Sequence, residues 1–117
     1  MKPDGIRHIA ILVDDADKAA VFYRDVLGLT QLRRPEGAPI RGAWFDAGGE
    51  QLHLMQPENP TMNPPHFAIC VADLASAVAA IRERGVAVYE VEHMPGAGYQ
   101  AVLTDPSGNL IELNQRE

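Results

Sequence analysis

The chain has 117 residues, of which 46% are hydrophobic and 22% are charged, and its formal net charge is −6. This composition is typical of one ordinary globular domain, residues 1–117, and the scattered basic residues argue against nucleic acid or an anionic membrane as a partner. No apolar run approaches the ~20 residues of a membrane span. The chain has a single cysteine, and we find no leader-like segment in it, so we expect a cytoplasmic protein.

The first module, residues 5–57, predicts the order β-α-β-β-β. It opens with a short, β-branched segment, which favours a strand over a helix. Asp15 is a candidate N-cap for the helix that follows, and Gly28 should end that helix. In chain order the predicted strands are 6–13, 29–34, 40–47 and 50–56.

A linker rich in proline and asparagine, residues 57–65, precedes a second module of the same order, residues 66–117. Asp73 is the second candidate N-cap, and Gly85 should end the second helix. We predict strands at 66–71, 86–91, 100–105 and 109–114. The glycine-containing stretch 93–99 is predicted to be a loop.

The two modules repeat each other, and each carries a residue of metal-ligand type at the same two places. Residues 8–13 read HIAILV and residues 66–71 read HFAICV. His8 precedes His53 by 45 residues, and His66 precedes Glu112 by 46. The two modules therefore align in sequence with an offset of one residue, and this repeat predicts that both have the same fold.

Strand alternation predicts that these four residues share one face of the sheet. The larger aliphatic side chains, such as Ile9 and Ile11, fall on the other face, where the helices should cover them. We therefore expect an α+β fold in which two tandem βαβββ modules form a curved mixed sheet around a metal pocket. Three imidazoles and one carboxylate suit a divalent ion (Zn, Ni, Co, Mn or Fe) and leave positions for water or substrate, as in catalytic sites.

By these features the chain resembles the vicinal oxygen chelate superfamily, which includes glyoxalases, bleomycin-resistance proteins and extradiol dioxygenases. The resemblance rests on the paired modules, on AVFYRDVLGL at 20–29 and on DPSGNLIEL at 105–113. It implies that one divalent ion is held by His8, His53, His66 and Glu112. It also implies a small substrate with neighbouring oxygens and a homodimer. We expect a metal-dependent lyase or isomerase in which Glu112 alternates between ligand and base.

Departures from individual members leave alternatives open. Leu12 and His53 stand where glyoxalase I has an arginine and a carboxylate, so glutathione-dependent chemistry is not expected. An Fe(II) extradiol-type dioxygenase would use two histidines and a glutamate, but Val102 stands where the family has a tyrosine. A protein that binds an antibiotic or metabolite without turnover is the other alternative. Tyr99 is a candidate substrate-binding residue.

Overall fold

The computed structural model describes the backbone of residues 1–117 and the side chains of all of them except Glu92. The chain divides into two compact units, and the second repeat begins at the residue where they divide. We call His8–Pro65 the N-terminal unit, and Met1–Arg7 together with His66–Glu117 the C-terminal unit. Each helix and strand of the two predicted βαβββ modules is present, so the prediction of an α+β fold is confirmed.

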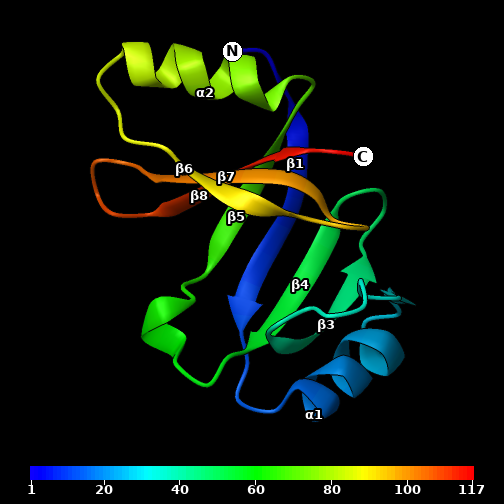
Figure 1. The fold of residues 1–117 in the computed structure, drawn as a ribbon. Coiled ribbons are helices and arrows are strands. Elements are labelled where there is room, and N and C mark those ends of the chain that lie inside the picture. Colours follow the sequence, from blue (N-terminus) through cyan, green and yellow to red (C-terminus); the bar gives the residue numbers. More distant parts are fainter. The chain divides into compact units, whose positions relative to one another are not determined.

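In the N-terminal unit a mixed sheet is covered by one short helix (Figure 1). The strand order is β2-β3-β4-β1, in which β1 and β4 are parallel and the other neighbours are antiparallel. Phe45 and Leu54 are buried beneath the helix. The elements are β1 (Pro3–Leu12, of which the residues from His8 on lie here), α1 (Ala16–Val21), the π-helical turn η1 (Phe22–Val26), β2 (Thr30–Leu32), β3 (Arg41–Asp46), β4 (Gln51–Gln56) and the 3-10 turn η2 (Pro60–Met62).

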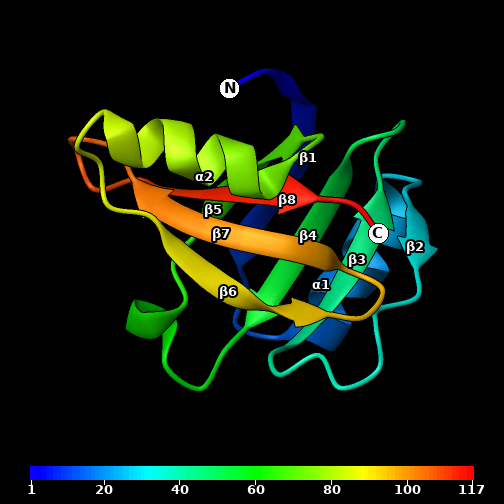
Figure 2. The same ribbon diagram turned by 45° about the horizontal axis from the view of Figure 1, so that its top comes forward.

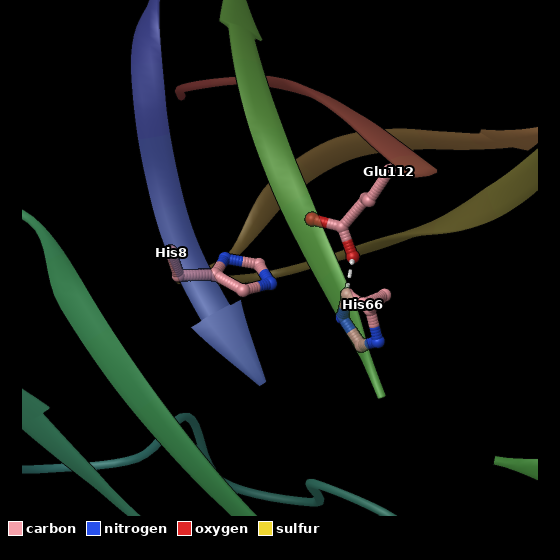
Figure 3. Close-up of side chains that lie close together, drawn as sticks. All are labelled: His8, His66 and Glu112. Atoms are coloured by element: carbon pink, nitrogen blue, oxygen red, sulfur yellow. Dashed lines mark ion pairs between the residues drawn. The ribbon is translucent and has the colours of Figure 1, made fainter. Parts of the chain in front are cut away.

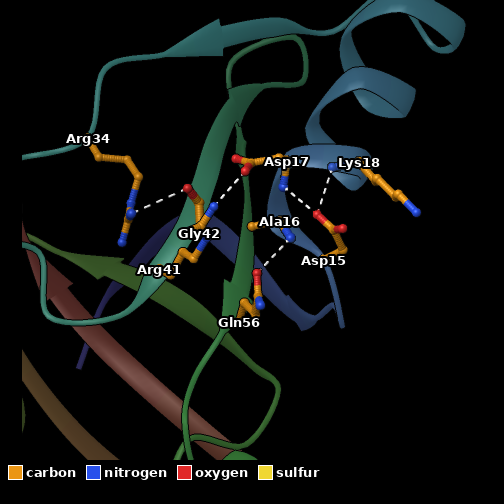
Figure 4. Close-up of polar contacts among 8 residues, drawn as sticks. All are labelled: Asp15, Ala16, Asp17, Lys18, Arg34, Arg41, Gly42 and Gln56. Carbon is orange, nitrogen blue, oxygen red and sulfur yellow. Dashed lines mark hydrogen bonds and ion pairs between the residues drawn. The ribbon is translucent and has the colours of Figure 1, made fainter.

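Side chains at the end of β4 and at the start of the helix fix α1 on this sheet (Figure 4). Asp15 accepts hydrogen bonds from the backbone N–H groups of Asp17 and Lys18, which confirms the predicted N-cap. Ala16 N–H donates to Gln56 Oε1 at 2.8 Å. The α-helix was expected to run on to Gly28. It instead gives way to η1, where the Leu27 N–H bonds to the carbonyl of Phe22 at 3.2 Å.

In the C-terminal unit the helix α2 covers one face of the sheet (Figures 1 and 2). The strand order is β1-β5-β8-β7-β6, with the part of β1 before His8 at one edge. Strands β5 and β8 are parallel, and β8-β7-β6 are antiparallel. Leu74 and Val78 of α2 pack on Val88, Ala101 and Leu113. The elements are β5 (His66–Val71), α2 (Leu74–Glu83), β6 (Tyr89–Met94), β7 (Gly98–Thr104) and β8 (Leu110–Gln115).

The predicted loop at 93–99 is wrong. Strand β6 continues to Met94 and β7 begins at Gly98, so a tight turn of three residues remains. The Ala97 N–H closes this turn on the Met94 carbonyl at 3.0 Å, and Gly98 takes a φ of +87°. The predicted strand 86–91 is also shifted, since β6 starts only at Tyr89. Pairing with β7 decides these bounds, and local composition does not reveal it.

Helices cover most of the aliphatic face, as predicted, but not all of it. Ile11 and Val13 pack into the N-terminal core, whereas Ile9 is 52% exposed. Separately, no helix formed by the described residues has the length and hydropathy to cross a bilayer.

Candidate metal centre

The C-terminal unit brings His66 and Glu112 together. Their strands β5 and β8 run side by side in parallel, with Ala68 opposite Glu112, so His66 falls on the same face as the carboxylate. His66 Nε2 lies 3.7 Å from Glu112 Oε1 (Figure 3). The two side chains are only 16% and 9% exposed. This pair was predicted from the repeat, and the structure places it on one face of one unit.

Burial dominates the electrostatics of Glu112. It raises the pKa of the Glu112 carboxyl from 4.5 to about 7, because the charged form loses its hydration. A hydrogen bond from Asn114 and the positive charge of Arg7 act in the opposite direction and favour the carboxylate. A buried carboxyl with a pKa near neutrality can take up and release a proton at the pH of a cell. A bound cation would hold it ionised.

The N-terminal unit brings His8 and His53 together. Both residues are buried, at 4% and 7% exposure, and Ala10 lies opposite His53 in the pairing of β1 with β4. The two rings stack with their centroids 4.0 Å apart. On its other side the His53 ring stacks on Trp44 at 3.9 Å. The Nε2 atom of His53 lies 2.8 Å from Gln51 Oε1.

Each unit therefore places its two predicted residues on one face, as strand alternation indicates. Imidazole and carboxylate groups that are buried to this extent normally form hydrogen bonds, pair with an opposite charge or bind a metal. The donor set fits a borderline divalent ion. That all four side chains hold a single ion stays a prediction.

Tyr99 lies outside these two pairs. It is 44% exposed, and its ring stacks on His93 with centroids 4.4 Å apart. His93 Nε2 in turn lies 2.5 Å from Glu117 Oε1. These contacts fix Tyr99 against its own hairpin, and its role in binding substrate stays a prediction.

Two polar residues of the candidate site were not singled out from the sequence. Gln51 contacts His53, and Asn114 acts on Glu112. Each lies two residues from its partner in the same strand and therefore on the same face. That spacing was visible in the sequence, and polar residues at such positions are the signal that could have identified them.

Comparison with known proteins identifies the family of this fold. A family model described as the Glyoxalase/Bleomycin resistance protein/Dioxygenase superfamily matches residues 5–113. The mitochondrial methylmalonyl-CoA epimerase of Bos taurus is 26% identical over 129 residues, which cover 94% of this chain and 73% of that protein.

Solved structures agree with this comparison. The crystal structure of methylmalonyl-CoA epimerase from Mycobacterium tuberculosis superposes with a TM-score of 0.80 at 24% identity, covering 97% of this chain and 88% of that one. A variant of the Streptomyces coelicolor epimerase in complex with 2-nitronate-propionyl-CoA gives a TM-score of 0.77 at 25% identity, covering 97% and 98%. These relatives are enzymes, and the expectation of an enzyme of this superfamily is confirmed.

Proposed function

The chain belongs to the Glyoxalase/Bleomycin resistance protein/Dioxygenase superfamily, and from that premise we propose that it is a divalent-metal-dependent isomerase. The reaction is the removal and return of a proton at the carbon beside a carbonyl group. The observation that carries the proposal is the buried pair of His66 and Glu112, in which a metal-ligand imidazole adjoins a carboxyl of pKa about 7. That pairing suits both metal binding and proton transfer.

We propose that His8 joins His66 and Glu112 in holding the ion. Each of the three offers one ligand atom, a ring nitrogen from each histidine and a carboxylate oxygen from Glu112. A second observation supports the placement of His8. It directly follows Arg7, and the charge of Arg7 acts on Glu112 within the C-terminal unit. His8 and His66 are also the matching residues of the two repeats.

His53 remains the proposed fourth ligand. Its contact with Gln51 is compatible with that role, because a metal-binding histidine ordinarily donates its other ring N–H to a nearby oxygen. In this arrangement His53 donates from Nε2 to Gln51 Oε1, and Nδ1 carries the lone pair for the ion. The stacked rings of His8 and Trp44 restrict the rotation of His53.

A divalent ion at this site would supply Lewis acidity, which polarises two neighbouring oxygens of a substrate. The protein contributes the other parts of the reaction. Glu112 is the base that takes the proton from the substrate carbon and the acid that returns a proton to that carbon. Burial disfavours the charged form of Glu112, which makes its carboxylate a stronger base than an exposed one.

The proposed substrate class is a 2-carboxyacyl thioester of coenzyme A. Two observations on relatives support it: the epimerases named above act on methylmalonyl-CoA by name, and one solved relative is in complex with 2-nitronate-propionyl-CoA. Such a thioester carries a carbonyl and a carboxylate on either side of one acidic carbon, which provides the two oxygens and the proton that the site requires.

An Fe(II) extradiol-type dioxygenase is a second candidate, and one observation favours it. His8, His66 and Glu112 would make a two-histidine, one-carboxylate set, which is typical of non-haem Fe(II) oxygenases. Against it, Val102 stands where these dioxygenases have a tyrosine. His93 is the candidate for the histidine that they carry before the Asp-Pro turn, and it is engaged by Tyr99 and Glu117.

Proton exchange tests the isomerase directly. Metal-loaded protein is mixed with methylmalonyl-CoA in D₂O, and loss of the proton signal at C2 is followed by NMR. We expect exchange far above the rate without protein, and loss of it in Glu112→Gln, whose amide cannot act as a base. Absence of exchange in the wild-type protein with Zn, Co, Ni and Mn contradicts the isomerase. Oxygen uptake with catechol in the Fe(II) form would show that the protein is a dioxygenase. Tight binding of a ligand without either reaction would show that it sequesters that ligand.

A further inference from the structure

Asn114 is the polar side chain that follows Glu112 on the same face of β8. The two residues are two apart in the strand, so their Cα atoms are separated by roughly 7 Å. Asn114 is only 2% exposed. Its neighbour in the pairing with β5 is Cys70, which shares the face of His66.

The other half of the repeat shows that the fold does not require an amide at this place. Met55 follows His53 as Asn114 follows Glu112, and Met55 is also buried, at 8% exposure. An apolar side chain thus fills the equivalent position of the N-terminal unit. Burying an amide costs free energy unless hydrogen bonds compensate for it. The hydrogen bonds of the Asn114 amide should therefore account for its burial.

The contacts of Asn114 are made by its nitrogen. Nδ2 donates to the carbonyl of Ala97, in the turn between β6 and β7, at 3.1 Å. The same side chain forms a hydrogen bond with Glu112. An amide nitrogen carries two hydrogens, so it can serve both acceptors. Among the described residues no donor reaches the buried Oδ1 of Asn114, so the orientation of the amide is set from its nitrogen side.

We propose that Asn114 is a positioning residue of the metal centre. Its Nδ2 bridges the Ala97 carbonyl and the Glu112 carboxylate, and this bridge fixes the direction in which Glu112 meets the ion. The inference rests on the proposed function, since it assumes that Glu112 is a ligand. Carboxylates that bind metals are themselves held by hydrogen bonds, and loss of such a partner typically lowers metal affinity about 10- to 100-fold.

Two substitutions test the bridge. Asn114→Leu keeps a side chain branched at the same carbon and removes the donor, and Asn114→Asp keeps size and polarity while removing the donor. Met55→Leu is the matched control, because Met55 occupies the equivalent place of the other unit. The readouts are the affinity for Co²⁺, measured by titration of the metal-free protein, and the visible absorption spectrum of Co²⁺ at saturation.

We expect both Asn114 variants to bind Co²⁺ about 10- to 100-fold more weakly, with an altered spectrum at saturation, and Met55→Leu to stay within about twofold of wild type. The spectrum reports only loaded protein, so a loss of folded molecules alone does not change its shape. Wild-type affinity and spectrum in both Asn114 variants overturn the inference.

His66→Ala, measured in the same series, separates this inference from the proposed function. Suppose that the wild type binds Co²⁺ and that His66→Ala does not. If the Asn114 variants then match the wild type, the metal site stands and only the role of Asn114 is overturned. If the wild type binds no Co²⁺, both proposals are contradicted together.

Discussion

The backbone N–H of Leu74 donates a hydrogen bond to Gln115 Oε1 at 2.8 Å, which fastens the start of α2 to the end of β8. The N-terminal unit repeats this bond between Ala16 and Gln56, also at 2.8 Å. Gln56 follows His8 by 48 residues and Gln115 follows His66 by 49, which is the same one-residue slip that separates the candidate ligands. The repeat therefore preserves a helix anchor as well as the candidate site.

Gln115→Ala should lower the free energy of unfolding by about 1–2 kcal/mol, because it leaves the first N–H of α2 without its acceptor. Urea unfolding followed by circular dichroism measures the change. Gln31→Ala is the control, since Gln31 is exposed and bonds only the exposed Arg24 among the described residues. Equal stability of Gln115→Ala and Gln31→Ala would show that the anchor contributes nothing.

Gly98→Ala should cost more stability than Gly108→Ala. Both glycines have nearly the same positive φ, +87° and +86°, so alanine is strained by about 1–2 kcal/mol at each. A Cβ at Gly98 would also lie 2.3 Å from the carbonyl oxygen of Gln115, whereas a Cβ at Gly108 meets nothing within 4 Å. Thermal unfolding of the two variants isolates the clash from the strain, and equal losses would contradict this account of the hairpin.

The stability of the metal-free protein should fall as the pH rises from about 4.5 to about 7. The pKa of Glu112 is raised in the folded state, so the folded chain binds more protons than the unfolded chain in that window. Stability is then fully present below the unfolded pKa and is lost as the pH passes the folded pKa, by up to roughly 3 kcal/mol. Glu112→Gln replaces the titrating carboxyl by an amide and so removes this contribution to the pH dependence.

Urea unfolding at pH 5 and pH 8 measures this dependence for the wild type and for Glu112→Gln. The difference between the two proteins cancels the other titrating groups. We expect the wild type to lose more stability than the variant between the two pH values. Parallel pH profiles would show that Glu112 titrates normally in the folded chain.

We also predict a homodimer. Apolar side chains on η1 and beside it are exposed, among them Phe22 at 48%, Val26 at 67% and Leu27 at 54%, and a second copy of the chain would cover them. Light scattering should give twice the chain mass of 12.7 kDa. A monomer at micromolar concentration would refute the prediction. If a dimer forms, mixing His8→Ala and Glu112→Ala chains shows whether sites are shared, since only shared sites recover metal binding in the heterodimer.

Much of the fold could be predicted because the two modules constrain each other. The strand at 66–71 and both N-caps, Asp15 and Asp73, follow from the repeat and from simple capping chemistry, and the structure has them as predicted. The β6–β7 hairpin could not be predicted in this way. Its residues combine weak strand propensity with Pro95 and two glycines, and only pairing across the hairpin extends the strands to Met94 and Gly98.

Strand alternation predicts the face of the sheet on which the four candidates lie, but not which strands are neighbours. The pairing of β5 with β8 and of β1 with β4, which brings His66 to Glu112 and His8 to His53, comes from the structure. Alternation says nothing about which ring atom is engaged, so the contact of His53 with Gln51 could not be anticipated. Alternation also does not say how far the helices extend over the aliphatic face, so the exposure of Ile9 could not be anticipated.

Metal content tests the central claim most directly. Untagged protein, purified without chelator and measured by elemental analysis, should carry close to one divalent ion per chain, and the identity of the ion separates iron from the other candidates. His66→Ala should lose most of this metal, because removal of one ligand weakens the hold of the rest, while the folded control Gln31→Ala should keep it. Metal retained in full by His66→Ala, or none in wild-type protein even after incubation with Zn²⁺, Co²⁺, Ni²⁺, Mn²⁺ and Fe²⁺, would contradict the proposed centre.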